Sequence, residues 1–71
     1  MIFFFERDGQ YLRCDIHAAP GGQGYELVMT HPDGSESREH HDSAETVYRR
    51  WNQLQGSLKD AGWWGPQGRE S

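Results

Sequence analysis

Turn signals divide the first half of this chain into short β-patterned runs, and the first of these signals is the clearest. Asp8-Gly9 separates residues 2–7 from residues 10–17, two runs that carry aromatic and aliphatic side chains. Asp-Gly is a strong signal for a two-residue hairpin, because both central residues of the favoured turn need a positive φ. The chain is therefore expected to begin with an antiparallel hairpin in which Arg7 lies opposite Gln10.

The register of this hairpin divides its side chains between two faces, because successive residues of a strand point to opposite sides. One face is expected to join the core and carries three cross-strand pairs: Phe5 with Leu12, Phe3 with Cys14, and Met1 with Ile16. The other face carries Glu6 with Tyr11, Phe4 with Arg13, and Ile2 with Asp15. Two large apolar side chains, Ile2 and Phe4, are thus predicted to lie away from the core.

Two further strands are predicted after a glycine-rich connection at residues 18–24, which leaves the pairing of the second and third strands open. Residues 25–31 alternate, with Tyr25, Leu27 and Met29 directed inward and Glu26, Val28 and Thr30 directed outward. Pro32-Asp33-Gly34 is typical of a three-residue hairpin loop, which would place His31 opposite Ser35. Residues 35–41 contain no apolar side chain and suit an exposed sheet edge, although propensity favours a simple loop almost equally.

A single amphipathic helix follows. Asp42 or Ser43 is the expected N-cap, and Glu45 stands three residues after Asp42 as in a capping box. An apolar stripe recurs at helical spacing and is expected to cover the inner sheet face: Ala44, Val47, Trp51, Leu54, Leu58 and Ala61, with Tyr48 at its margin. Gly62 is expected to end the helix in a Schellman motif.

These elements predict an α+β fold: a four-stranded antiparallel meander with one C-terminal helix packed on one face, in the order ββββα. Residues 1–64 would form a single small domain and residues 65–71 a flexible C-terminal tail. A chain of 71 residues buries only a small core, so association with a partner is a plausible source of further stability.

Charge and composition narrow the function classes. The formal net charge of −4 disfavours general binding to nucleic acid, which needs clustered Lys and Arg. The apolar residues 1–5 are followed at once by charged residues, so they are too few for a signal peptide or a membrane span, and a cytoplasmic protein without membrane contact is expected. Cys14 has no second cysteine with which to form a disulfide.

No catalytic residue, metal site or cofactor is expected. The ligand-type side chains, which lack ligand spacing, are Cys14, His17, His31, His40 and His41. His40 and His41 are adjacent and would point to opposite faces of a strand. Cys14 falls on the inward pattern and is interpreted as a small core residue. The chain is therefore predicted to be non-enzymatic.

The face opposite the helix is the candidate partner-binding surface, with the residues Ile2, Phe4, Tyr11, Arg13 and Val28, to which Trp64 is added because it has no local partner. An apolar centre with Tyr and Arg anchors is typical of a protein interface, and a homodimer is its simplest form. Two alternatives stay open. Scattered surface apolar residues are ordinary, and the same aromatic and Arg side chains could stack single-stranded nucleic acid.

The order of the predicted elements over residues 2–61 resembles the repeat unit of the PUR family of nucleic-acid-binding proteins. The resemblance rests on element order and on no motif. It implies association in pairs and contact with nucleic acid through aromatic and basic sheet residues, for which Phe4, Tyr11 and Arg13 are the nearest counterparts. The acidic balance and the polar fourth strand depart from that pattern.

Overall fold

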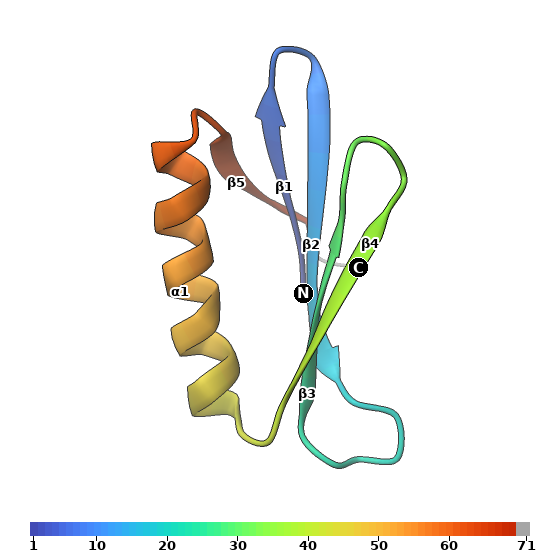
Figure 1. Ribbon diagram of the computed structural model, residues 1–71. Coiled ribbons are helices and arrows are strands. Elements are labelled where there is room, and N and C mark those ends of the chain that lie inside the picture. Colours follow the sequence, from blue (N-terminus) through green and yellow to red (C-terminus); the bar gives the residue numbers. More distant parts are fainter. Residues whose placement is uncertain (70–71) are drawn as a thin grey trace.

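The computed structural model describes residues 1–69, which form one antiparallel sheet and one helix (Figure 1). The elements are β1 (Ile2–Arg7), β2 (Gln10–Ala18), β3 (Tyr25–Thr30), β4 (Glu36–His41), α1 (Ala44–Asp60) and β5 (Trp64–Arg69). The strands lie in the order β4-β3-β2-β1-β5, and α1 packs against one face. We call the face under α1 the inner face and the opposite one the outer face. The predicted α+β class is confirmed.

The predicted first hairpin is confirmed residue by residue. Asp8 and Gly9 have φ values of 52° and 78°, as a two-residue turn of this kind requires. Arg7 pairs with Gln10, Phe5 with Leu12 and Phe3 with Cys14. The Ile16 N–H donates to the Met1 carbonyl oxygen at 2.9 Å, which extends the same register to the chain start.

The structure also decides two matters that the sequence left open. Ala18 pairs with Tyr25, which fixes the register of β2 against β3. Residues 36–41 form an edge strand rather than a loop, and the His31 N–H donates to the Ser35 carbonyl oxygen at 2.8 Å as the predicted loop requires. An all-polar strand is stable there because its outer edge faces solvent.

The helix begins at Ser43 and ends at the predicted glycine. The Ser43 side chain accepts from the Thr46 N–H, so the alternative cap at Asp42 with Glu45 is wrong. At the other end the Gly62 N–H donates to the Lys59 carbonyl at 3.0 Å and the Trp63 N–H donates to the Leu58 carbonyl at 2.9 Å. These two hydrogen bonds form the expected Schellman motif.

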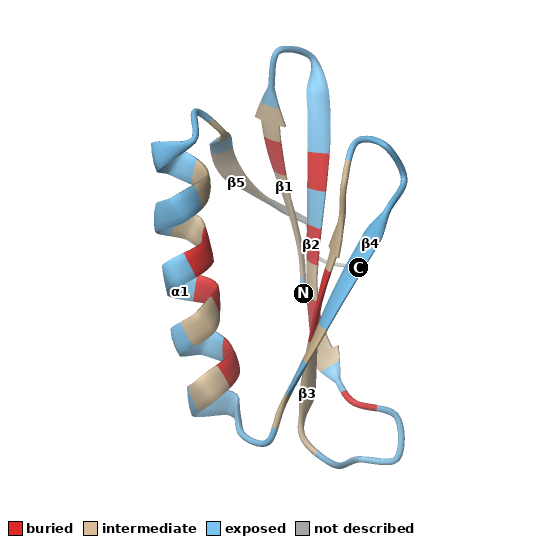
Figure 2. Ribbon diagram, viewed as in Figure 1, coloured by how far each residue is buried: buried red, intermediate tan, exposed pale blue. Residues whose placement is uncertain are grey.

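The core lies between α1 and the inner face (Figure 2). Its buried members are Phe5, Leu12, Cys14, Ile16, Leu27, Val47, Trp51 and Leu54. The Trp51 ring stacks on Phe3 with a centroid distance of 4.8 Å. The ends of the predicted helix stripe do not reach the core, because Ala44 and Ala61 are exposed.

A fifth strand extends the predicted four-stranded sheet. Trp64–Arg69 forms β5 and pairs antiparallel with β1, with a register shift between Phe4 and Glu6. The flexible tail expected at residues 65–71 is therefore wrong as far as Arg69, and residues 70 and 71 lie outside the described part. Gly65, Pro66 and Gly68 oppose a strand by local propensity, but β1 would otherwise expose an unpaired backbone edge. Tertiary pairing therefore overrides local preference.

Gly65→Ala is expected to lower the free energy of unfolding by about 1–3 kcal/mol. An added Cβ would meet the Phe4 carbonyl oxygen at 2.8 Å and the Phe5 side chain at 2.9 Å, in a backbone conformation with φ of 150°. Urea denaturation followed by Trp fluorescence measures the change. The control is Gly56→Ala in α1, where nothing lies within 4 Å of an added Cβ. This control should raise stability by about 0.5–1 kcal/mol. Equal effects of the two changes would contradict the close approach of β5 to β1.

Candidate outer-face interface

The sheet register brings the predicted partner-binding residues to one face. Phe5 is fully buried on the inner face, so the even-numbered residues of β1 lie on the outer face. Their cross-strand partners lie there too: Tyr11, Arg13 and Asp15 on β2, and Trp64 and Gln67 on β5. The outer face therefore carries all six predicted residues, which are Ile2, Phe4, Tyr11, Arg13, Val28 and Trp64.

Three aromatic residues on this face, Phe4, Tyr11 and Trp64, form what we call the aromatic patch. Tyr11 is 56% exposed and Trp64 is 67% exposed, and both pair with Glu6, so they flank it in one row across β5, β1 and β2. Phe4 is half-buried in the next row, between Gln67 and Arg13. Large aromatic side chains left in water on the side away from α1 are the surface feature that most needs an explanation.

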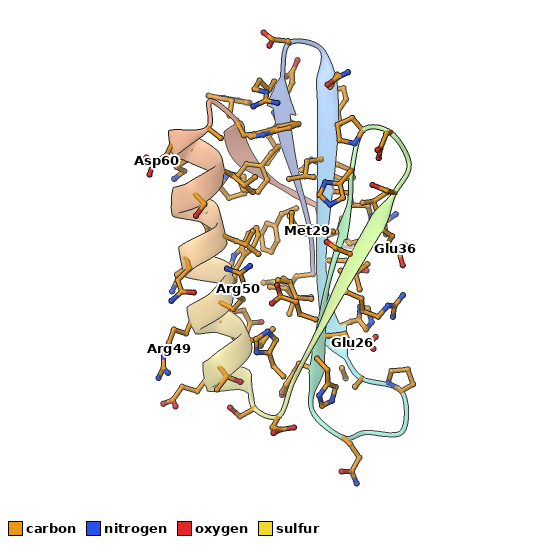
Figure 3. All side chains as sticks on the ribbon, in the orientation of Figure 1. Glu26, Met29, Glu36, Arg49, Arg50 and Asp60 are labelled. Atoms are coloured by element: carbon orange, nitrogen blue, oxygen red, sulfur yellow. The ribbon has the colours of Figure 1, made fainter. Side chains whose placement is uncertain are left out.

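The other part of the outer face is charged, and its charges meet one another. Glu26 accepts from Arg38 Nη1 at 2.8 Å and contacts His17 Nε2 at 3.0 Å. Arg38 Nη2 donates to Glu36 at 3.1 Å, and His17 Nδ1 lies 3.5 Å from Asp15. We call these five residues the charged half. Glu26 and Glu36 project from the sheet on the side away from α1 (Figure 3).

Val28 lies among the residues of the charged half. It belongs to the outer face but is buried, with 8% of its surface exposed. It pairs with Asp15 on one side and with Arg38 on the other. A hollow of about 180 Å³ is lined by Arg13, Asp15, His17, Val28, Thr30, Glu36 and Arg38. The long charged side chains thus cover most of Val28, which contributes much less accessible surface than the sequence alone predicted.

Glu26 is the centre of this charged arrangement. Its side chain is only 13% exposed, and the hydrogen bond from His17 together with the Arg38 guanidinium lowers the pKa of its carboxyl below the ordinary value. The two partners are themselves 39% and 50% exposed, so solvent screens the attraction. The charged half is therefore internally satisfied, and it has little need of an external partner.

The remaining ligand-type residues do not converge. His40 contacts the Gln23 carbonyl at 2.9 Å, and His41 contacts Glu39 at 3.1 Å. Over residues 1–69, no group of three or more His, Cys, Asp or Glu side chains is placed to hold a metal ion. Cys14 is fully buried, as predicted, and burial raises the pKa of its thiol to about 12.

An open groove of about 490 Å³ lies beside the end of α1, where sequence reasoning had marked no site. It is lined by Arg7, Gln10, His31, Pro32, Asp33, Ser35 and Trp63. The Arg7 guanidinium carbon lies 4.6 Å from the centroid of the Trp63 ring, and Arg7 Nη1 donates to the Ala61 carbonyl oxygen at 2.9 Å. The Asp33 carboxylate accepts from the Ser35 N–H and hydroxyl. These polar groups hold the helix end and the β3–β4 loop in place.

Sequence reasoning placed Glu6 on the outer face but did not find Gln67. Glu6 lies between the two exposed aromatic rings, and Gln67 borders Phe4. Glu6 could be placed by the hairpin register, but its neighbour Trp64 depends on β5. No local signal for β5 exists, since three of its six residues are Gly or Pro. Over residues 1–69, no helix is long and apolar enough to cross a membrane.

Glu26→Gln is expected to lower stability at neutral pH and to flatten the loss of stability in acid. The pKa of Glu26 is lowered in the folded state, so its contribution is present above the unfolded pKa of about 4.3 and is lost as the pH falls through the lower folded value. Urea midpoints measured between about pH 7 and pH 3 test this for both proteins. Parallel profiles would show that the ionised carboxylate contributes nothing.

A comparison with known proteins finds no match to this chain among protein-family models, curated proteins or solved structures. What the chain does is therefore inferred from the outer face itself. There the aromatic patch is exposed and the neighbouring charges are largely paired.

Proposed function

We propose that this chain is a non-enzymatic module that associates with a protein surface through its outer face, and that a second copy of the chain is the simplest such partner. The observation that carries the proposal is the exposure of Tyr11 and Trp64 on the face away from α1. One helix covers one face of the sheet, and Tyr11 and Trp64 on the other face are exposed to solvent.

The composition of the patch suits a protein partner. Tyr, Trp and Arg are the residues that most often dominate binding energy at interfaces. The Tyr and Trp rings bury a large area at a small cost in conformational entropy. Arg13 stands beside the patch and is 49% exposed, so its guanidinium is accessible to an incoming ring or carboxylate. The Asp15 carboxylate beside the patch resembles part of a polar rim, whereas Glu6 lies between the two exposed rings.

The size of the outer face limits the affinity expected for the association. The axes of the five strands span roughly 19 Å, and six residues extend roughly 20 Å along each strand, from the usual spacing and rise. An outer face of this size, buried on both partners, corresponds to the small end of specific interfaces. We therefore expect reversible association of modest affinity. A cytoplasmic location belongs to the same proposal, because a reducing compartment suits a chain whose single cysteine has no disulfide partner.

Single-stranded nucleic acid is a weaker candidate for this face. Stacking platforms combine aromatic rings with free cations that track phosphates. Here the Glu6 carboxylate lies between the two exposed rings, and Arg38 is paired with Glu26 and Glu36. Arg13 lies 3.9 Å from Asp15. The charges next to the aromatic patch therefore oppose a phosphate backbone more than they attract it.

Tyr11→Glu is expected to dissociate the oligomer, because it places a charge in the aromatic patch without touching the core. Sedimentation equilibrium over a wide concentration range measures the association of wild type and variant, and far-ultraviolet circular dichroism should be unchanged. Tyr48→Glu is the matched control, since Tyr48 is a 41%-exposed aromatic residue on α1. Phe4→Glu provides a second change within the patch. A wild type that stays monomeric, or a Tyr11→Glu protein that associates as tightly, would contradict the proposal.

A fluorescent single-stranded oligonucleotide provides the test against the alternative function. No binding is expected at low salt, where any electrostatic attraction to phosphates would be strongest. Fluorescence anisotropy at about 20 mM and about 200 mM salt measures it. Binding that weakens with salt and disappears in Arg13→Ala would support the nucleic-acid function instead.

A further inference from the structure

We infer that two copies of this chain associate face to face about a two-fold axis that runs parallel to the strands, midway between β1 and β2. This inference rests on the proposed function and specifies its geometry. Such an axis exchanges β1 with β2, so each outer-face residue of β1 meets, on the partner copy, its own cross-strand neighbour. The pairs across the interface are then Glu6 with Tyr11, Phe4 with Arg13, and Ile2 with Asp15.

The charges of the hairpin select this axis. An axis along β1 would place Glu6 against its own copy, and an axis along β2 would do the same to Arg13 and to Asp15. Like charges directly opposed are unfavourable. Midway between the strands, each of these charged residues faces an uncharged one. Its own copy is moved one strand spacing to the side, and for Glu6 and Arg13 an opposite charge lies one row along the facing strand.

The charged half argues for the same orientation. An axis perpendicular to the strands would lay β3 and β4 on the same strands of the partner copy and would take the paired charges of Glu26, Glu36 and Arg38 out of water. With the axis between β1 and β2, β4 lies beyond the partner's sheet and β3 faces only its edge strand β5. Most of the paired charges then stay in water, where they are already satisfied, and Trp64 lies at the rim of the interface.

Phe4 and Arg13 form the central contact. They occupy the middle of the three outer-face rows of the hairpin. The strands of two packed sheets cross at about 30°, so the two sheets are closest near the middle of the contact and separate toward its ends. The Arg13 guanidinium would lie on the ring of the partner copy's Phe4, a cation–π contact, and would reach the carboxylate of Glu6 on the same partner strand. Asp15 keeps its contacts within its own protomer, with the N-terminal amine at 3.9 Å and with His17 at 3.5 Å.

Charge reversal with mixing tests this geometry. Arg13→Glu alone opposes Glu6 of the partner copy, and Glu6→Arg alone opposes its Arg13, so each variant should associate about tenfold or more weakly than wild type. An equal mixture of the two variants should regain wild-type association, because the heterodimer restores both opposite-charge pairs. Sedimentation equilibrium at equal total concentration measures all three samples. The matched controls are Glu45→Arg and Arg49→Glu, an exposed pair on α1 that should leave association unchanged.

Each outcome has a definite meaning. Weak single variants with a restored mixture support the two-fold axis. Weak single variants whose mixture stays dissociated, or single variants that associate normally while Tyr11→Glu dissociates, overturn this axis and leave the outer-face interface standing. A monomeric wild type overturns both. If one single variant fails to fold, the double variant Glu6→Arg/Arg13→Glu, which keeps one charge of each sign, must still associate as wild type does.

Discussion

The packing of Trp51 against the first strand is the contact on which the rest of this structure depends. Its ring stacks on Phe3 at 4.8 Å and meets Phe5 edge-on at 5.9 Å, and it is only 5% exposed. Rings of this size supply much of the apolar area that so short a chain can bury. The contact ties α1 to the centre of the sheet, and Val47 and Leu54 extend it along the helix.

Because α1 is the one helix of the described chain, the sheet has one covered face and one bare face. The bare face has two parts that differ in how their side chains are covered. On β2, β3 and β4, ionic side chains pair with one another and cover Val28. On β5, β1 and β2, the exposed rings of Trp64 and Tyr11 have no such cover, which is why association is proposed for that part.

The two sheet edges are handled differently as well. Glu36–His41 is an all-polar strand, whose charged side chains discourage pairing with another chain. At the opposite edge the chain returns from α1 and covers β1 with β5. The return depends on Gly62, which ends the helix, and on Gly65, where a side chain would collide with Phe4 and Phe5. The strand that covers β1 also brings Trp64 to the outer face, so one stabilising device shapes the candidate site.

The local elements of this protein follow from short-range patterns in its sequence. Asp8-Gly9 set the hairpin and its register, Pro32-Asp33-Gly34 set the next turn, and the spacing of Val47, Trp51 and Leu54 set the buried side of the helix. These are properties of neighbouring residues, so they can be recognised without knowing the fold. Three features become visible only in the folded chain: Trp64–Arg69 is a strand, Val28 is covered, and Trp64 lies beside Glu6. Each of these features depends on groups that are distant along the chain. The unpaired edge of β1 binds a segment with poor strand propensity. Arg38, which lies opposite Val28, comes from another strand.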